Sequence, residues 1–241
     1  MRAGLLVTCL VDLVRPRIGL AAVKLLEEAG CEVVVPPTQT CCGQPGWNSG
    51  DRRSARALAQ KLIEEFEPCD YVVVPSGSCA GMVRAHYKDL FPGEGAWLER
   101  AEGLARKTYE LTDFLVTVAE MGRVPGEYSG TITYHDSCSG LRELGVKRQP
   151  RALLARMAGV QLKEMKEAET CCGFGGTFSV KFGDISAAMA QAKCDHARAT
   201  GAGAVVLGDL GCMLSIEGKL RRMGDEQTLV LHVAEVLTWE R

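Results

Sequence analysis

Eight of the eleven cysteines in this chain form a pattern that occurs twice. Each half carries a single cysteine, an adjacent pair after 31 or 32 residues, and a fourth cysteine after a further 36 or 39. Matching cysteines are 129, 130, 130 and 133 residues apart, and such a nearly constant offset indicates an internal duplication. The first cysteine set is Cys9, Cys41, Cys42 and Cys79, and the second cysteine set is Cys138, Cys171, Cys172 and Cys212.

The paired cysteines favour metal binding over simple packing, because the sequence Cys-Cys-Gly-x-x-Gly occurs at both 41–46 and 171–176. Neighbouring residues on a strand point to opposite faces, so both thiols reach one site only where the backbone turns. Gly43 and Gly173 permit such a turn and let the backbone approach a bound group. Thiolate-rich sites suit zinc or iron–sulfur clusters. We therefore predict a metal ion or cluster at each set; metal-free thiol chemistry and plain packing are the alternatives.

Polar residues beside the first cysteine distinguish the two halves. Tyr134-His135-Asp136 precedes Cys138, whereas the first half has apolar Leu5-Leu6-Val7 at the matching position. His135, with Asp136, is a candidate catalytic base near neutral pH, and Arg142 is a candidate for bidentate binding of a carboxylate. The alternative is that His135 and Asp136 orient metal ligands. The hypothesis is that the second site is chemically active and the first is a relay or structural site.

Short apolar runs between helical segments are the elements that must position these residues. Continuous β-branched-rich runs predict strands buried on both faces, as in a parallel sheet. Right-handed crossovers place the carboxyl ends of such strands at one edge, where open α/β sheets bind ligands. We predict an α/β fold of two tandem pseudo-symmetric βαβαβ units, 1–122 and 130–241, joined by a linker at 123–129, with the cysteines at the carboxyl ends of the strands. The predicted strands are 5–8, 33–35, 71–74, 131–134, 160–163 and 204–207.

Composition narrows the class of protein further. The 241 residues include 46% hydrophobic and 24% charged residues, with a net charge of −2, which is typical of a globular protein rather than a nucleic-acid-binding one. No apolar run approaches the roughly 18 residues of a membrane helix, and the run before Cys9 is too short for a signal peptide. We expect a cytoplasmic protein, in which cysteines are more often metal ligands than disulfides. Cys31, Cys69 and Cys194 have no counterpart and are predicted to be small buried hydrophobes.

The motifs resemble the cysteine-rich CCG family, found in a cysteine-rich component of heterodisulfide reductase and in the iron–sulfur subunits of glycolate and glycerol-3-phosphate oxidation. The resemblance implies small α/β domains that hold a [4Fe-4S] cluster, non-cubane in the best understood members, with zinc as the alternative. Within the family the sequence is most similar to the lactate utilisation group. The motifs that carry this similarity are GLAAVKLLEEAGC at 19–31, QTCCGQPGWNSG at 39–50, PSGSCAGM at 75–82, YHDSCSGLR at 134–142 and TCCGFGG at 170–176.

The resemblance implies an iron–sulfur subunit of an oxidoreductase that oxidises L-lactate to pyruvate and relays electrons through its clusters. The implied partners are a ferredoxin-like iron–sulfur subunit and a third small subunit. A zinc-stabilised interaction subunit, or a related glycolate or heterodisulfide oxidoreductase subunit, remains the alternative.

One departure from the family pattern affects the predicted ligands. The first cysteine of the family's final Cys-x-x-Cys is replaced by Ser76 and Asp209, so each site has one thiolate fewer and a five-cysteine cluster cannot form unchanged. Asp209 is a candidate oxygen ligand. Two kinds of metal centre fit this donor set: a cluster with an open or oxygen-ligated iron, and a single zinc ion held by four thiolates.

Overall fold

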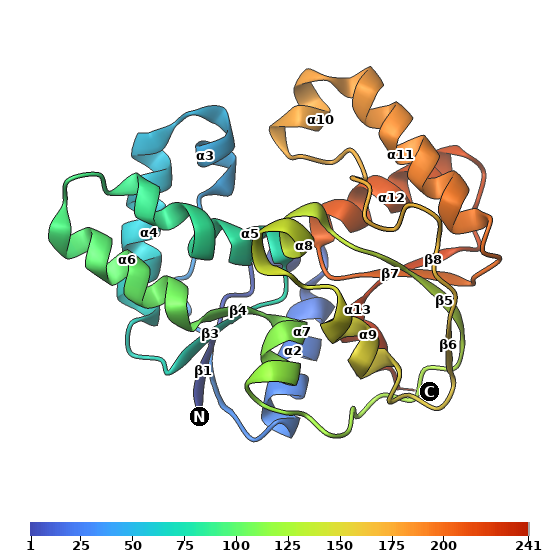
Figure 1. Cartoon of the computed structure of the whole chain (residues 1–241), viewed down its shortest axis with the longest axis horizontal. Helices are drawn as coiled ribbons and strands as arrows, with labels where there is room; N and C mark the ends of the chain where they lie inside the picture. The colour runs from blue at the N-terminus through green and yellow to red at the C-terminus, as the bar shows by residue number, and fades with distance from the viewer. Residues whose placement is uncertain (241) are drawn as a thin grey trace. The chain divides into compact units, whose positions relative to one another are not determined.

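The computed structural model describes residues 1–240 of the chain and has two compact units, Met1–Met121 and Gly122–Arg241 (Figure 1). Each unit contains a four-stranded, all-parallel sheet with helices between the strands. The segment 123–129, predicted as a linker, lies in the second unit. There the Gly126 N–H donates to the Leu237 carbonyl at 2.8 Å and the Glu127 N–H donates to the Trp239 carbonyl at 2.9 Å.

The first unit has the strand order β2-β1-β3-β4. Ala3 of β1 pairs with Val33 of β2 on one side and with Tyr71 of β3 on the other. Strand β4 was not predicted, because its sequence Thr-Tyr-Glu contains no apolar run. The elements are β1 (Arg2–Leu5), α1 (Cys9–Val14), α2 (Pro16–Glu28), β2 (Glu32–Val34), α3 (Gln44–Ser49), α4 (Arg52–Phe66), β3 (Tyr71–Val74), α5 (Gly77–Gly81), the π-helix η1 (Met82–His86), the 3₁₀-helix η2 (Tyr87–Leu90), α6 (Gly95–Lys107), β4 (Thr108–Glu110) and α7 (Leu111–Thr117).

The second unit repeats this order as β6-β5-β7-β8, which confirms the predicted α/β fold of repeated units. Its fourth strand, β8, was also not predicted, although its sequence Leu-Val-Leu-His is largely apolar. His232 ends β8 and caps α13. The elements are β5 (Gly130–His135), α8 (Cys138–Leu144), α9 (Arg148–Leu154), β6 (Val160–Leu162), α10 (Thr177–Lys181), α11 (Gly183–Arg198), β7 (Ala204–Leu207), α12 (Leu210–Arg222), β8 (Leu229–His232) and α13 (Val233–Leu237).

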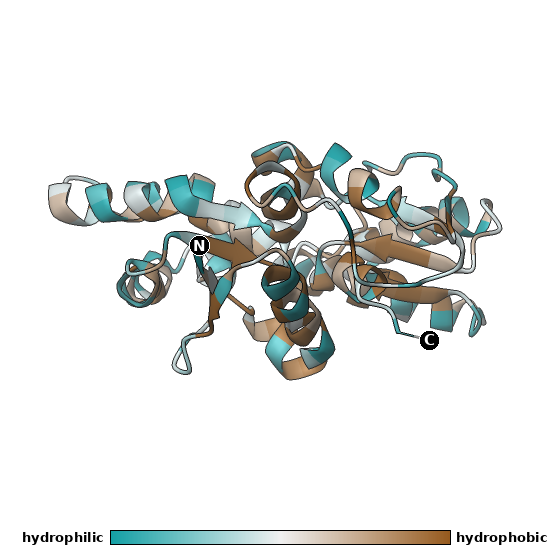
Figure 2. Ribbon diagram, turned by 90° about the horizontal axis from the view of Figure 1, so that it is seen from below, coloured by the Kyte–Doolittle hydropathy of each residue, from teal (hydrophilic) through white to brown (hydrophobic). Residues whose placement is uncertain are grey.

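Amphipathic helices cover the sheets, and their ends follow from local sequence. Helix α2 begins with Pro16 at its first turn, buries Ile18, Ala22 and Leu25, and is followed by Gly30 with φ +76°. Helix α4 starts where the Asp51 carboxylate accepts the Ser54 N–H at 3.0 Å. Figure 2 shows hydrophobic residues concentrated on the strands and hydrophilic residues on the outward turns of helices. No helix within residues 1–240 is both long and apolar enough to cross a bilayer.

The strand order places both cysteine sets where α/β sheets bind ligands. In each unit the chain passes from a central strand outward to one neighbour and then returns to the opposite side, so a topological switch point lies between β1 and β3, and between β5 and β7. Cys9 begins the helix after β1, and Cys79 lies in the helix after β3. Cys138 and Cys212 have the same positions after β5 and β7.

Candidate metal centres

The structure brings the four thiols of the first cysteine set together at this edge of the sheet. Cys9 and Cys42 hydrogen-bond to Cys41, and Cys42 also contacts Cys79. The pKa of Cys41 is lowered to about 3, chiefly by the thiols of Cys42 and Cys9. The Gly43 N–H, which donates to the Cys41 sulfur at 3.4 Å, lowers it further. Cys41 is therefore the cysteine of the set in which the thiolate is most favoured, and the thiolate is the form that binds metal.

The second cysteine set forms the same chain of sulfur contacts. Cys138 and Cys172 hydrogen-bond to Cys171, and Cys172 also contacts Cys212. The pKa of Cys171 is lowered to about 2, chiefly by the Cys138 thiol and then by that of Cys172. The Gly173 N–H donates to the Cys171 sulfur at 3.3 Å. The duplication in the sequence thus corresponds to two similar clusters of thiols.

The glycine after each cysteine pair is needed for the close approach of the next long helix. Gly43 has φ +87° and Gly173 has φ +84°, a left-handed conformation that favours glycine. A Cβ at Gly43 would lie 3.2 Å from the Ala55 carbonyl oxygen, and one at Gly173 would lie 2.5 Å from that of Ser186. The two glycines thus let α4 and α11 pack against the cysteine loops.

A different hydroxyl anchors each cysteine pair. The Tyr87 hydroxyl donates to the Cys42 carbonyl at 2.9 Å, and the Ser215 hydroxyl donates to the Cys172 carbonyl at 3.0 Å. Tyr87 is fully buried, and its pKa is raised well above the usual value by burial. Sequence reasoning missed both residues, because they lie outside the cysteine motifs.

The two residues that replace the family's additional cysteine cap helices. The Ser76 hydroxyl accepts the Cys79 N–H at 3.4 Å at the start of α5. The Asp209 carboxylate accepts the Gly211 N–H at 3.1 Å at the start of α12. Both side chains are buried, so they position the helix turn that carries the last cysteine of each set. Asp209, predicted as an oxygen ligand, therefore lies at the second site, and one of its carboxylate oxygens accepts the Gly211 N–H.

His135 lies among the thiols of the second set. It ends β5, is 0% exposed, and one of its ring nitrogens lies within 4.8 Å of the sulfurs of Cys172 and Cys212. Neither ring nitrogen makes a hydrogen bond of regular geometry within the described residues. Burial lowers the pKa of His135 to about 3, the charge of Lys193 lowers it further, and a weak interaction with the Ala168 backbone opposes both. The imidazole therefore faces the cluster in its neutral form.

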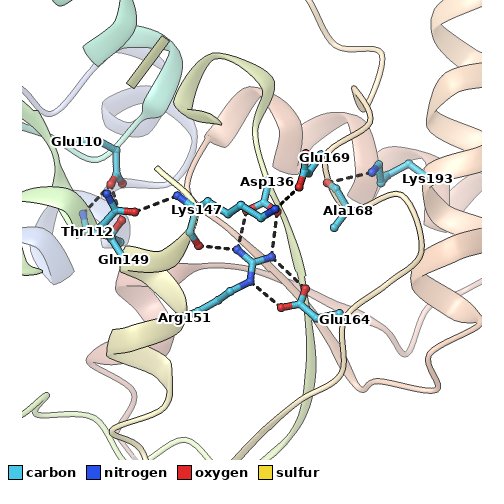
Figure 3. A network of polar contacts seen from close by, with 10 residues as sticks. All are labelled: Glu110, Thr112, Asp136, Lys147, Gln149, Arg151, Glu164, Ala168, Glu169 and Lys193. Carbon is cyan, nitrogen blue, oxygen red and sulfur yellow. Dashed lines mark hydrogen bonds and ion pairs between the residues drawn. The ribbon is translucent and has the colours of Figure 1, made fainter. Parts of the chain in front are cut away.

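Asp136 binds Arg151 rather than the thiols (Figure 3). Its two carboxylate oxygens accept from the Arg151 guanidinium at 2.7 and 2.9 Å, and its side chain is only 1% exposed. Arg151 also binds the Glu164 carboxylate at 2.6 and 3.0 Å. Arg142 lies exposed in the last turn of α8, outside this network. Sequence reasoning missed Arg151, which lies on the next helix, outside the cysteine motifs.

Lys193 of α11 is a buried cation of the second unit that sequence reasoning also missed. Its side chain is 2% exposed, and its ammonium donates to the carbonyls of Glu167 and Ala168. Burial lowers the pKa of Lys193, whereas the nearby Cys172 raises it more than any other group does. The corresponding turn of α4 in the first unit carries buried Leu62 and Ile63. The available signal was a lysine at helical spacing from the apolar residues Ala190 and Ala197.

Comparisons with known proteins define the class to which this fold and these thiols belong. The sequence matches the CCG family of cysteine-rich domains over residues 3–84 and 132–217, segments that contain every cysteine of the two sets. The chain therefore belongs to the CCG cysteine-rich domain family, as its motifs predicted.

Particular relatives match nearly the whole chain. It is 44% identical over 237 residues to "Lactate utilization protein A 2" of Bacillus cereus strain Q1, covering 98% of each chain. It is 45% identical, with the same coverage, to "Lactate utilization protein A" of Bacillus cytotoxicus. A crystal structure of a hypothetical protein from Helicobacter pylori is similar to 100% of this chain and 49% of that chain, with a TM-score of 0.64 and 10% identity. That likeness concerns the fold alone.

Proposed function

We propose that this chain is the iron–sulfur subunit of a cytoplasmic multi-protein oxidoreductase that oxidises L-lactate to pyruvate. The observation that carries the proposal is the convergence, in each unit, of four cysteines in one chain of sulfur contacts, with the pKa of Cys41 or Cys171 lowered within it. The names of relatives that match 98% of the chain supply the substrate. The proposed partners are a ferredoxin-like iron–sulfur subunit, which accepts the electrons, and a third small subunit.

The residues of both sites fit a thiolate-bound metal. The sulfurs contact one another without forming disulfides, and the paired cysteines Cys42 and Cys172 are only 2% and 1% exposed. Backbone N–H groups at Gly43 and Gly173 support the central thiolates. A bound iron–sulfur cluster would supply one-electron redox chemistry. The chain itself would hold the cluster and exclude water from it.

We place substrate oxidation at the second site, with the first as a relay or structural site. Buried polar groups support this assignment, since His135 and Lys193 lie there while the first unit has Leu6, Leu62 and Ile63 in the corresponding places. Asp136 and its partner Arg151 stiffen the end of β5. Arg142, exposed one turn beyond Cys138, is the proposed contact for the substrate carboxylate.

A zinc-stabilised subunit is the second candidate, favoured by one observation. Each set offers four thiols, which is the complete ligand set of a structural zinc site. In that case the reaction would take place on a partner subunit, and this chain would provide an interaction scaffold.

Metal analysis of the full chain, purified without oxygen, separates the two candidates. We expect iron with acid-labile sulfide at both sites, and loss of about half of the metal in each of Cys42→Ser and Cys172→Ser. Cys31→Ser is the matched control, because Cys31 is buried but outside both sets. One zinc per site without sulfide would establish the scaffold alternative. A wild-type chain that binds neither metal, and does not support lactate-dependent electron transfer with its partners, would refute the proposal.

A further inference from the structure

We infer that His135 is a ligand of the second metal centre, so that this centre combines imidazole with thiolates while the first has thiolates alone. The inference rests on the proposed metal binding and deepens it by assigning different donor sets to the two sites. It changes the part assigned to His135 from proton acceptor or orienting group to direct ligand.

The position of the ring is close to that of a ligand. One ring nitrogen and the sulfurs of Cys172 and Cys212 all lie within 4.8 Å of one another. Around a tetrahedral ion, bonds of about 2.3 Å to sulfur and about 2.0–2.1 Å to nitrogen place sulfurs about 3.8 Å apart and nitrogen about 3.6 Å from sulfur. A contraction of up to about 1 Å would therefore bring these three atoms to bonding distance of one ion placed between them.

The isolation of the ring points to a missing partner. His135 is 0% exposed, and neither of its nitrogens makes a hydrogen bond of regular geometry within residues 1–240, where only the Ala168 backbone interacts weakly with the ring. An unsatisfied buried polar group costs about 1–3 kcal/mol, and native proteins rarely retain one without a reason. Coordination to a metal would satisfy one nitrogen at once.

The first unit shows that the fold itself does not require a histidine here. His135 pairs with Leu207 of β7, and Leu6 occupies the matching place beyond the last pair of β1 and β3. Leu6 is fully buried, so an apolar side chain fills the same space. The strand register also prevents His135 from turning toward solvent, because the next residue, Asp136, is held by Arg151.

An imidazole ligand would give the second centre a distinct redox character. A neutral histidine carries one negative charge fewer than a thiolate, and replacing cysteine by histidine on a cluster iron raises its reduction potential. The second centre would then accept electrons more readily than the first. A more oxidising second centre is suited to taking electrons from the substrate. It favours the structural role over the relay role for the first centre, because electrons do not pass readily to a centre of lower potential.

The test uses cobalt(II) loaded anaerobically into the full chain carrying Cys42→Ser, so that only the second site binds tightly. Cobalt X-ray absorption is expected to show nitrogen together with sulfur ligands. Adding His135→Leu, which copies the residue of the first unit, should remove the nitrogen signal. It should also weaken cobalt binding more than about 100-fold, beyond the 10–100-fold effect of a residue that only orients a ligand.

Two further samples complete the design. Thr133→Val is the matched control, because Thr133 lies two residues earlier on β5 and also has a buried hydroxyl without a partner in the described part of the chain. It should leave both the spectrum and the affinity unchanged. Cys172→Ser, which leaves the first site as the tight one, should show sulfur ligands without nitrogen.

The outcomes separate this inference from the proposal on which it rests. A sulfur-only spectrum in the Cys42→Ser protein would overturn the inference even if His135→Leu fails to fold. An unchanged spectrum and affinity in His135→Leu would do the same, while leaving metal binding by the thiols intact. A wild-type chain that binds no cobalt would overturn the inference, whereas the proposed function is refuted only by the iron, sulfide and zinc analysis described above.

Discussion

Replacing Arg151 by methionine should destabilise the second unit strongly. The substitution keeps an unbranched side chain on α9 but removes the guanidinium that binds Asp136 through two hydrogen bonds, at 2.7 and 2.9 Å. Asp136 cannot recover these bonds from water, since its side chain is only 1% exposed. The variant therefore leaves a buried carboxylate without its cation.

The magnitude follows from the different exposure of the two carboxylates that Arg151 binds. Breaking a buried ion pair by removing one partner costs about 3–5 kcal/mol. The Glu164 side chain is 48% exposed, and such a pair contributes about 0–1 kcal/mol. Arg151→Met should thus cost about 3–5 kcal/mol and Glu164→Gln less than about 1 kcal/mol. Replacing both partners, as Asp136→Leu with Arg151→Met, should recover much of the loss.

Urea denaturation followed by tryptophan fluorescence measures these changes in the second unit alone. The chain has three tryptophans, and Trp47→Phe with Trp97→Phe leaves Trp239, which packs on Tyr128 with ring centroids 5.2 Å apart. For a unit of this size the dependence of the unfolding free energy on urea is about 1–3 kcal/mol per molar. The midpoint should therefore fall by roughly 2 M in Arg151→Met.

Equal effects of Arg151→Met and Glu164→Gln would contradict this reasoning. So would a loss below about 1 kcal/mol for Arg151→Met, which would mean that Asp136 does not depend on the guanidinium. A double substitution as unstable as Arg151→Met alone would show that the arginine acts by packing, for example against the Tyr134 ring 4.9 Å away, rather than by its charge.

Two other predictions concern a glycine and a buried carboxyl. Gly173→Ala should lower the melting temperature more than Gly201→Ala. Both glycines have positive φ, where an alanine costs about 1–2 kcal/mol, but only at Gly173 would the new Cβ lie 2.5 Å from a carbonyl oxygen. Equal shifts in melting temperature would exclude the steric cause. Burial raises the pKa of Glu110 from 4.5 to about 7. The native state therefore holds a proton that the unfolded chain releases, and stability of the first unit should fall as pH rises from about 4.5 to about 7, by up to about 3 kcal/mol. Glu110→Gln should abolish this slope in pH-dependent denaturation, and a slope retained in the variant would assign it to another group.

The sequence alone determined the duplication, the buried strands and the family. These features are local or periodic: cysteines at constant offsets, continuous apolar runs at β3 and β7, and proline and glycine at helix ends. The strand predicted at 5–8 in fact ends at Leu5, because β1 spans Arg2–Leu5 and Thr8 has φ +76°. Strands β4 and β8 escaped prediction. They lie at sheet edges, where pairing with β3 and β7 depends on non-local contacts. Strand β4 has no apolar run of its own, whereas β8 has the short run Leu-Val-Leu.

Only the tertiary structure decided what the polar residues near the second site contact. His135 and Asp136 are neighbours in sequence, yet one faces the thiols and the other binds Arg151 on a separate helix. Neighbouring residues at the end of a strand point to opposite faces, so the partner of each depends on what packs on that face. Lys193 approaches the thiols for the same reason. It lies on the face of α11 that packs against the cysteine loop, a proximity that sequence spacing cannot encode.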